Sequence, residues 1–547
     1  MRTLAAALAI AALLGAGLAG PAGARAASAG EEAEAKAKAK VTQSEALTEA
    51  SKDPNVEKER QLHPDLSGSV NWVEGHWEVA WFAEGKELAL VLVDPDSGEV
   101  KESWTGYQVA WKMARGYSGQ FGHTLNAPYV FLPLCAIFLV GLFDWRRWRR
   151  VANLDLLVLL AFGVSHFFFN RGEIGVSVPL YYPVLLYLLG RALWIGFRGR
   201  GEGLRPSWPA VWLLIAALFL MGFRVGLNIA DSGTADIGYA SIVGADRIAH
   251  GEAVYGNFPS DIPEGDTYGP VSYFAYVPFE RIWPWSGVWD DVDGAHAAAV
   301  SFDIATFALL ILLGLRIRPG PEGRRLAATL AFGWAAYPYT AMVLESNSND
   351  GLVAMLMVAL LVWLARPALR GALASLAAFA KFAPAVLAPM LLTYRGEEEQ
   401  RSPLRSAVLF AGAFVAFGVL AMLWPAIDPG LRTFYDRTLG FQVDRHSPFS
   451  IWGQVPSLDW LRDALLLATA ALSIALAFVP RRKSLVQVAA LSAAAILALQ
   501  ITMKHWFYLY IPWFYPLLLV ALATLAVRRE EAPGPSAEQS SPPALVG

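Results

Sequence analysis

The chain has 547 residues, of which 55% are hydrophobic and 17% are charged, and its formal net charge is −3. Soluble domains carry about 25% charged residues, so most of this chain is not a soluble domain. The charge balance gives no indication of a nucleic-acid partner, and the single cysteine excludes both a disulfide framework and a cysteine-based metal site. Apolar runs of about 20 residues recur, which is the length that a helix needs to cross a bilayer. These features predict an all-α polytopic membrane protein.

The N-terminal residues have the pattern of a secretory signal. Arg2 precedes an apolar stretch from Leu4 to Leu18, and small residues follow. This order is typical of a signal peptide, which we place at residues 1–29, with an uncleaved signal anchor as the alternative. Residues 30–64 are rich in Ala, Glu and Lys, so we expect a disordered charged linker that is at most partly helical and has no core of its own.

Residues 65–127 change in character, because apolar side chains now alternate with polar ones. This period of two predicts strands, and the alternating residues are Trp72, Trp77, Val79, Trp81, Leu88, Leu90 and Leu92. Turns are expected at residues 84–86 and 94–98. The stretch LALVLVDPDSGEVKESWTG resembles the PepSY-type module, which implies a small α+β extracytoplasmic domain that either docks a partner or acts as a passive cap.

Eleven spanning segments are predicted along the rest of the chain. They begin near residues 128, 154, 178, 209, 295, 325, 351, 406, 463, 485 and 507. Basic stretches such as DWRRWRR follow alternate segments, and basic loops face the cytoplasm. Together with the signal peptide, this rule puts residues 27–127 outside the cytoplasm and the disordered tail at residues 528–547 inside it, in a protein of the inner (plasma) membrane.

One stretch breaks this alternation of sides. Residues 370–393 are apolar, but basic residues lie at both ends, and Lys381 and Pro384 interrupt the run. Because proline breaks an interior helix, we expect a hairpin or broken helix pair that returns to the cytoplasmic side, or else two short crossings. The bundle would then have about 11–13 spanning helices.

The outward-facing polar segments are residues 229–293, 344–350 and 425–462, together with the short KHW that begins at Lys504. Asp231 and Asp236 open the first of these segments, ahead of apolar residues at helical spacing that indicate an amphipathic surface helix. A carboxylate at the rim of a membrane can act as a general base toward a hydroxyl. The alternative is that each aspartate only caps the following helix.

The run DIGYASIVGADRIAHGEAVYG, followed by TYGPVSYFAYVPF, resembles the first outer loop of GT-C membrane glycosyltransferases. The branch it resembles uses polyprenyl-phosphate mannose as donor. By this resemblance Asp236 is the catalytic base, and Asp231, Tyr255 and Tyr268 bind substrate. The family has a Tyr-Pro-Pro element where this chain has Tyr268-Gly269-Pro270, which is a departure.

Three further segments resemble the same family and supply the remaining substrate-binding residues that we predict. Their elements are SNSND followed by KFAP, then RHSPFSIW, then KHW. The residues are Asn349, Lys381, Arg445, His446, Lys504 and His505. Each has a simpler alternative: a helix cap for Asn349, a lysine that reaches the cytoplasmic interface for Lys381, and contact with lipid headgroups for the others.

The resemblance implies a glycosyltransferase core at residues 205–527, after three accessory helices in residues 128–204. It implies transfer of a sugar, with mannose expected, from a polyprenyl-phosphate donor to a glycolipid or glycan outside the cytoplasm. No cofactor and no nucleic acid are expected. A metal is optional, although Asp231, Asp236 and His250 could form a weak site. The alternative is a transporter or lipid flippase, which internal repeats would favour, and a sensor is a third interpretation.

Overall fold

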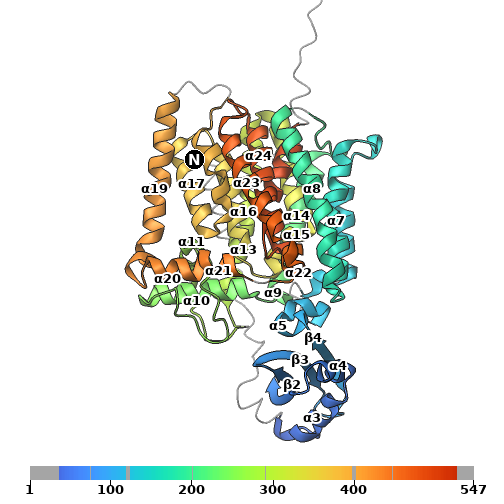
Figure 1. Cartoon of the computed structure of the whole chain (residues 1–547). Helices are drawn as coiled ribbons and strands as arrows, with labels where there is room; N and C mark the ends of the chain where they lie inside the picture. Colours follow the sequence, from blue (N-terminus) through green and yellow to red (C-terminus); the bar gives the residue numbers. More distant parts are fainter. Residues whose placement is uncertain are drawn as a thin grey trace, which may run out of the picture.

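The computed structural model describes residues 36–73, 75–118, 123–199, 201–289, 291–396, 402–445 and 447–525. The expected signal peptide, the tail after Arg528 and His446 lie outside these residues. The described chain is mostly helical, with a small antiparallel sheet domain ahead of a large helix bundle (Figure 1).

The sheet domain is a four-stranded meander with the order β1-β2-β3-β4. Its strands are β1 (Ser67–Val73), β2 (His76–Ala83), β3 (Lys86–Val93) and β4 (Val100–Thr105). The predicted turns are present, with Glu84 and Gly85 both at positive φ and with the Asp94 carboxylate accepting backbone N–H groups from Asp96 and Ser97. The alternation therefore predicted the sheet correctly.

The expectation of a disordered linker was wrong for the part that the structure describes. Helices α3 (Gln43–Ser51) and α4 (Pro54–Leu62) cover one face of the sheet. Ala46, Ala50 and Val56 are buried against a row of β2 and β3 side chains that includes Trp77 and Val91. The opposite face packs Leu90 against Val109 of α5 (Tyr107–Ala110). Burial of these small apolar side chains offsets the entropy cost of ordering a segment that is otherwise highly charged.

The bundle begins after two short turns, η1 (Lys112–Ser118) and η2 (His123–Asn126). Its first half consists of α6 (Pro128–Leu142), α7 (Val151–Asn170), α8 (Ile174–Arg198), α9 (Ala210–Asp231), α10 (Asp236–His250), α11 (Pro270–Phe274), α12 (Val277–Glu280), α13 (Asp293–Ile317), α14 (Gly320–Ala336) and α15 (Pro338–Glu345). Its second half consists of α16 (Asp350–Val362), α17 (Pro367–Ala380), η4 (Ala383–Leu387), α18 (Ala388–Leu392), α19 (Pro403–Ile427), α20 (Leu431–Tyr435), η5 (Asp436–Gly440), α21 (Phe441–Asp444), α22 (Ile451–Gln454), α23 (Asp459–Phe478), α24 (Leu485–Thr502), η7 (Tyr508–Tyr510) and α25 (Ile511–Leu525).

Eight helices among the described residues are long and apolar enough to cross a membrane. Every predicted segment coincides with a helix, but α6, α14 and α16 have only 15, 17 and 13 residues. A straight crossing of the hydrocarbon core needs about 20 residues. The protein is therefore a multi-pass membrane protein in which several helices are shorter than the sequence pattern suggested.

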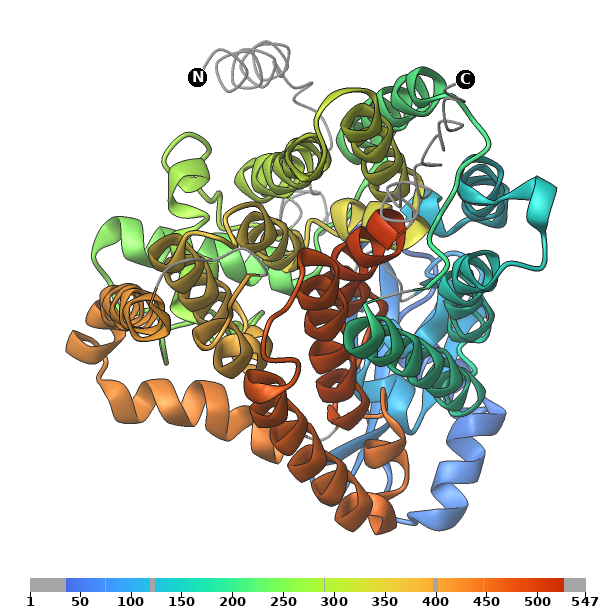
Figure 2. The ribbon, with the colours of Figure 1, turned by 90° about the horizontal axis from the view of Figure 1, so that it is seen from above.

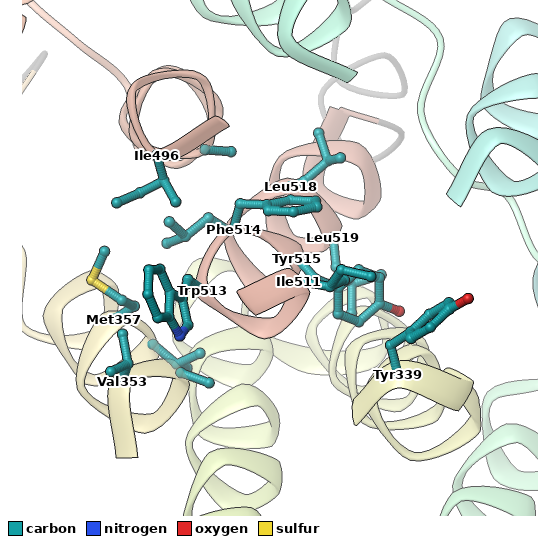
Figure 3. Close-up of a cluster of buried hydrophobic side chains, with 14 of the residues drawn as sticks. Tyr339, Val353, Met357, Ile496, Ile511, Trp513, Phe514, Tyr515, Leu518 and Leu519 are labelled. Carbon is teal, nitrogen blue, oxygen red and sulfur yellow. The ribbon is translucent and has the colours of Figure 1, made fainter. Parts of the chain in front are cut away.

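Helix α25 forms the centre of the bundle, and all of its residues are buried. Figure 3 shows Trp513, Phe514 and Tyr515 of this helix among side chains from α15, α16 and α24. The peripheral helices α19 and α23 differ, because much of their apolar surface is exposed. Seen from above, the segment from α20 to α21 runs along the edge of the bundle between them (Figure 2). Exposed apolar helix faces of this kind are suited to contact with lipid.

The interruption at residues 370–393 is a hairpin, as one of the two expectations proposed. Helix α17 ends at Ala380, Lys381 has an extended backbone conformation, and the chain then continues into η4 and α18. The two arms lie side by side, because the guanidinium of Arg370 near the start of α17 donates to the carbonyl of Leu391 at 3.0 Å. The tip of the hairpin, at residues 380–382, thus points away from both of its ends.

Candidate functional site

A cavity lies at the end of the bundle that carries the sheet domain. Residues from five separate parts of the chain line it: Trp111, Met113, Asp236, Ile237, Tyr268, Arg445, His505, Phe507, Leu509 and Tyr510. Four of the ten predicted site residues therefore meet in one place.

Asp236 is the first residue of α10, which lies across the end of the bundle (Figure 1). The helix is less exposed than its amphipathic pattern suggested, because residues Ile237–Ala245 are all buried. Asp236 itself remains exposed to the cavity. One carboxylate oxygen accepts the backbone N–H of Ile237 at 2.8 Å, and Ala235 takes the capping position without a side-chain bond.

The protein around the cavity changes the electrostatics of Asp236. Desolvation raises the pKa of its carboxyl, and the Ile237 N–H and the nearby charges of Arg445 and Lys381 partly oppose this rise. A raised pKa strengthens a carboxylate as a base. Asp236 thus combines access to a cavity with the chemistry of a proton acceptor.

Lys381 lies at the hairpin tip and forms a buried ion pair. Its ammonium donates to the carboxylate of Asp350, at the start of α16, at 2.5 Å. The Trp513 indole N–H donates to the same oxygen at 2.7 Å, and the hydroxyl of Ser348 also bonds to this carboxylate. The interpretation of Lys381 as a lysine that reaches the cytoplasmic interface is therefore wrong, and Asp350 is held by three donors.

Tyr268 stands between this ion pair and the cavity. The Lys381 ammonium lies 5.2 Å from the centre of its ring, and the Tyr255 hydroxyl donates to its backbone carbonyl at 3.0 Å. The structure explains why glycine, and not the proline of the family element, occupies position 269. The N–H of Gly269 donates to the Ala380 carbonyl at 3.2 Å, and a Cβ there would collide with the carbonyl of Phe379. Proline has no N–H to donate to Ala380 and carries a Cβ that would meet the Phe379 carbonyl, so it does not fit at this position.

Arg445 supplies positive charge to the cavity. Its guanidinium carbon lies 5.6 Å from the ring centre of Phe441 and 5.9 Å from that of Trp111. Its Nε atom has no hydrogen-bond partner, and no carboxylate within the described residues forms a salt bridge with it. A cation without a carboxylate partner, held between aromatic rings, is available to an anionic ligand.

His505 lines the cavity, but it is not a second cation. One of its ring nitrogens is 2.8 Å from the hydroxyl of Ser447. Burial, together with the charges of Arg445 and Lys381, holds its pKa well below the usual value, so the imidazole is neutral near pH 7. Lys504 is directed elsewhere, because its ammonium donates to the Val443 carbonyl at 3.0 Å.

Three other predicted residues do not line the cavity. Asp231 ends α9 and accepts a hydrogen bond from the hydroxyl of Thr124. Tyr255 is buried with Tyr273 and Phe434, and its hydroxyl donates to the backbone carbonyl of Tyr268. Asn349 is buried and donates to the hydroxyl of Ser241 in α10 at 3.0 Å. These side chains support the site rather than form it.

Sequence reasoning missed two contributions to the site. Asp350 was recognisable as a carboxylate at the start of an apolar helix, and the isolated charge of Lys381 indicated that a partner must exist. Trp111 gave no such signal. The other residues that line the cavity lie more than 100 positions further along the chain, and the sequence around Trp111 does not indicate that it meets them.

The described residues contain no group of three His, Cys, Asp or Glu side chains that could hold a metal ion. His250 pairs with Asp246 at 3.0 Å, so the weak site considered from Asp231, Asp236 and His250 is not assembled there.

Comparison with known proteins gives one result. Residues 267–503 match the model of glycosyltransferase family 87. The match covers less than half of the chain, and it includes Tyr268, Lys381 and Arg445 but neither Asp236 nor His505. We found no match between the chain and any curated protein. Over the matched segment the chain is similar to family 87, and together with the apolar helices this match supports a membrane glycosyltransferase.

Proposed function

We propose that the protein transfers a sugar from a polyprenyl-phosphate donor, with mannose expected, to the hydroxyl of a glycolipid or glycan acceptor. The observation that carries this proposal is the presence of Asp236 and Arg445 in one cavity. A base for an incoming hydroxyl and a cation for a departing phosphate are the two groups that such a transfer needs.

The proposed step is a single displacement. The acceptor oxygen attacks the anomeric carbon of the donor while Asp236 accepts the hydroxyl proton, and the new carbon–oxygen bond forms as the bond to the phosphate oxygen breaks. The phosphate leaves with the bonding electron pair, and Arg445 stabilises its charge by paired N–H donors. Asp236 then releases the proton to water.

The surroundings of Asp350 favour this single step over a covalent intermediate. A second carboxylate would be needed as a nucleophile for transfer in two displacements. Asp350 is engaged by Lys381, Trp513 and Ser348 and does not line the cavity. We therefore expect inversion at the anomeric carbon.

A lipid-linked donor fits the outer surface of the bundle. Helices α19 and α23 expose large apolar side chains: Val408, Leu409, Val415, Leu420, Leu423, Leu467, Ile474 and Phe478. Lipid around these helices would let the polyprenyl tail stay in the bilayer while its phosphate reaches Arg445.

We further propose that the site and the sheet domain are extracytoplasmic. The basic segments that alternate between apolar helices support this orientation. Reporter fusions at Ser103 and at the C-terminus are expected on opposite sides of the inner membrane, and fusions that report the same side would contradict the topology.

The function is tested with purified protein in detergent, polyprenyl-phosphate hexoses carrying a labelled sugar, and lipids extracted from the cell envelope. Transfer of label to an envelope lipid supports the proposal. A flippase or transporter makes no new covalent product. If none of the donors is consumed under any of these conditions, the result favours that alternative.

A further inference from the structure

The wall of the cavity that faces the sheet domain comes from a strap at residues 107–118, which we define as α5, Trp111 and η1. Trp111 and Met113 line the same cavity as Asp236. The strap follows β4 directly, so the chain that leaves the small domain contributes side chains to the site at the end of the helix bundle.

The strap is fixed to the bundle by close contacts in both of its halves. The Gln108 side-chain amide donates to the Gly172 carbonyl, between α7 and α8, at 2.9 Å. Gly116 has a φ of +74°, and a Cβ on it would lie 2.6 Å from the Asn170 carbonyl oxygen. A side chain there could not be accommodated without movement of the backbone. These contacts hold the strap in one position over the cavity.

A further clamp fixes the loop that carries Trp111. The Arg115 guanidinium donates to the carbonyls of Gln108 and Val109 at 2.7 and 3.0 Å. The Trp111 ring meets Phe449 edge-on at 5.3 Å between ring centres and lies 5.7 Å from the His505 ring. The indole is thus held by neighbours on several sides, while part of it remains exposed to the cavity.

We infer that Trp111 is the stacking surface for a pyranose ring of the acceptor, and that Met113 completes this apolar wall. The inference rests on the proposed function, which it deepens by naming an acceptor subsite. An aromatic face is electron-rich, and the C–H bonds on one side of a pyranose carry partial positive charge, so the two surfaces attract each other.

The position of the strap selects the acceptor rather than the donor. The donor phosphate is assigned to Arg445, and its lipid tail must leave toward the apolar helices. The strap lies between the sheet domain and the bundle (Figure 1), on the side from which an envelope saccharide would arrive in the proposed topology. A sugar stacked on Trp111 would present its hydroxyl to the cavity that holds Asp236.

The test compares Trp111→Phe with Trp111→Leu. Both remove the indole, but only phenylalanine keeps an aromatic face. Trp111→Leu is expected to raise the acceptor KM at least 10-fold with little change in the donor KM, and Trp111→Phe is expected to recover most of this loss. The matched control is Trp72→Leu, which removes a tryptophan of the same domain that packs against Trp77 in the sheet and should leave the acceptor KM unchanged.

A binding measurement separates this inference from the proposed function. Fluorescently labelled hexyl glycosides of mannose, glucose and galactose are titrated into the parent, Trp111→Phe and Trp111→Leu proteins, and anisotropy is measured without donor. Weaker binding of at least one glycoside to Trp111→Leu alone supports the subsite even if no donor is turned over. Equal binding to all three proteins, or no binding to the parent, overturns the inference, whereas transfer by the parent would still stand as evidence for the function.

Discussion

Asp236→Asn changes the group on which the proposed chemistry depends most. The substitution is nearly isosteric, and the hydrogen bond that this side chain accepts from the Ile237 N–H at 2.8 Å can be kept by the amide oxygen. The fold and the donor site should therefore persist. Loss of general-base catalysis should lower kcat by about 100-fold or more, which corresponds to about 2.7 kcal/mol in the activation barrier.

The raised pKa of Asp236 adds two signatures. Activity of the parent should fall as the pH drops through this raised pKa, because the carboxylate becomes protonated, and the low residual activity of the variant should lack this limb. Stability changes in the opposite sense. A carboxyl whose pKa is raised on folding favours the folded state most at low pH, and this contribution is lost as the pH rises. At neutral pH the variant should therefore unfold at the same or a higher temperature than the parent.

The assay measures initial transfer rates at matched levels of folded protein, together with thermal unfolding in detergent. Asp231→Asn is the matched control, because Asp231 lies on α9 outside the cavity and should keep most of the activity. Parent-like turnover by the Asp236 variant would refute the reasoning. A larger loss at Asp231 than at Asp236 would mean that the other carboxylate is the base.

Three further predictions concern the surroundings of the site. Lys381→Met should destabilise the protein by about 3–5 kcal/mol, because it leaves a buried Asp350 carboxylate without its cation. In thermal unfolding, the double variant Lys381→Met/Asp350→Asn should recover much of this loss. Equal losses in the single and double variants would contradict the pairing. Gly116→Ala should lower the melting temperature more than Gly106→Ala, since both glycines have positive φ but only Gly116 faces a backbone carbonyl; equal shifts would argue against a fixed strap. Burial raises the pKa of Glu280 to about 7, so the contribution of this carboxyl to the stability of the fold should decline between pH 4.5 and about 7. Melting temperatures of Glu280→Gln should lack this decline. A parallel decline in the variant would show that another group is responsible.

The sequence predicted the membrane class, the strands and the break near Lys381 because each depends on local patterns. The sequence alone shows these patterns, with no knowledge of tertiary contacts: hydropathy over about 20 residues, period-two alternation, and an ionisable side chain within an apolar run. The helices in residues 43–62 were missed because they are too polar to show a stripe, and their stability comes from a few small side chains packed on the sheet.

The site was only partly predictable for a related reason. Asp236, Tyr268, Arg445 and His505 were identified from motif resemblance, and the structure brings them to one cavity. The neutral state of His505 and the direction of Lys504 depend on burial and on a distant backbone carbonyl. Such properties follow from tertiary packing, which a motif does not specify.

The most direct test of the central claim is the stoichiometry of transfer by the purified protein. Polyprenyl-phosphate mannose with label in both the sugar and the phosphate is incubated with envelope lipids, and the products are separated by chromatography. The proposed function predicts one labelled polyprenyl phosphate released for each mannose that appears on an acceptor lipid, with a rate that falls about 100-fold in the Asp236→Asn protein. Movement of intact donor without any cleavage of the bond between sugar and phosphate, for this and other polyprenyl-phosphate hexoses, would contradict it.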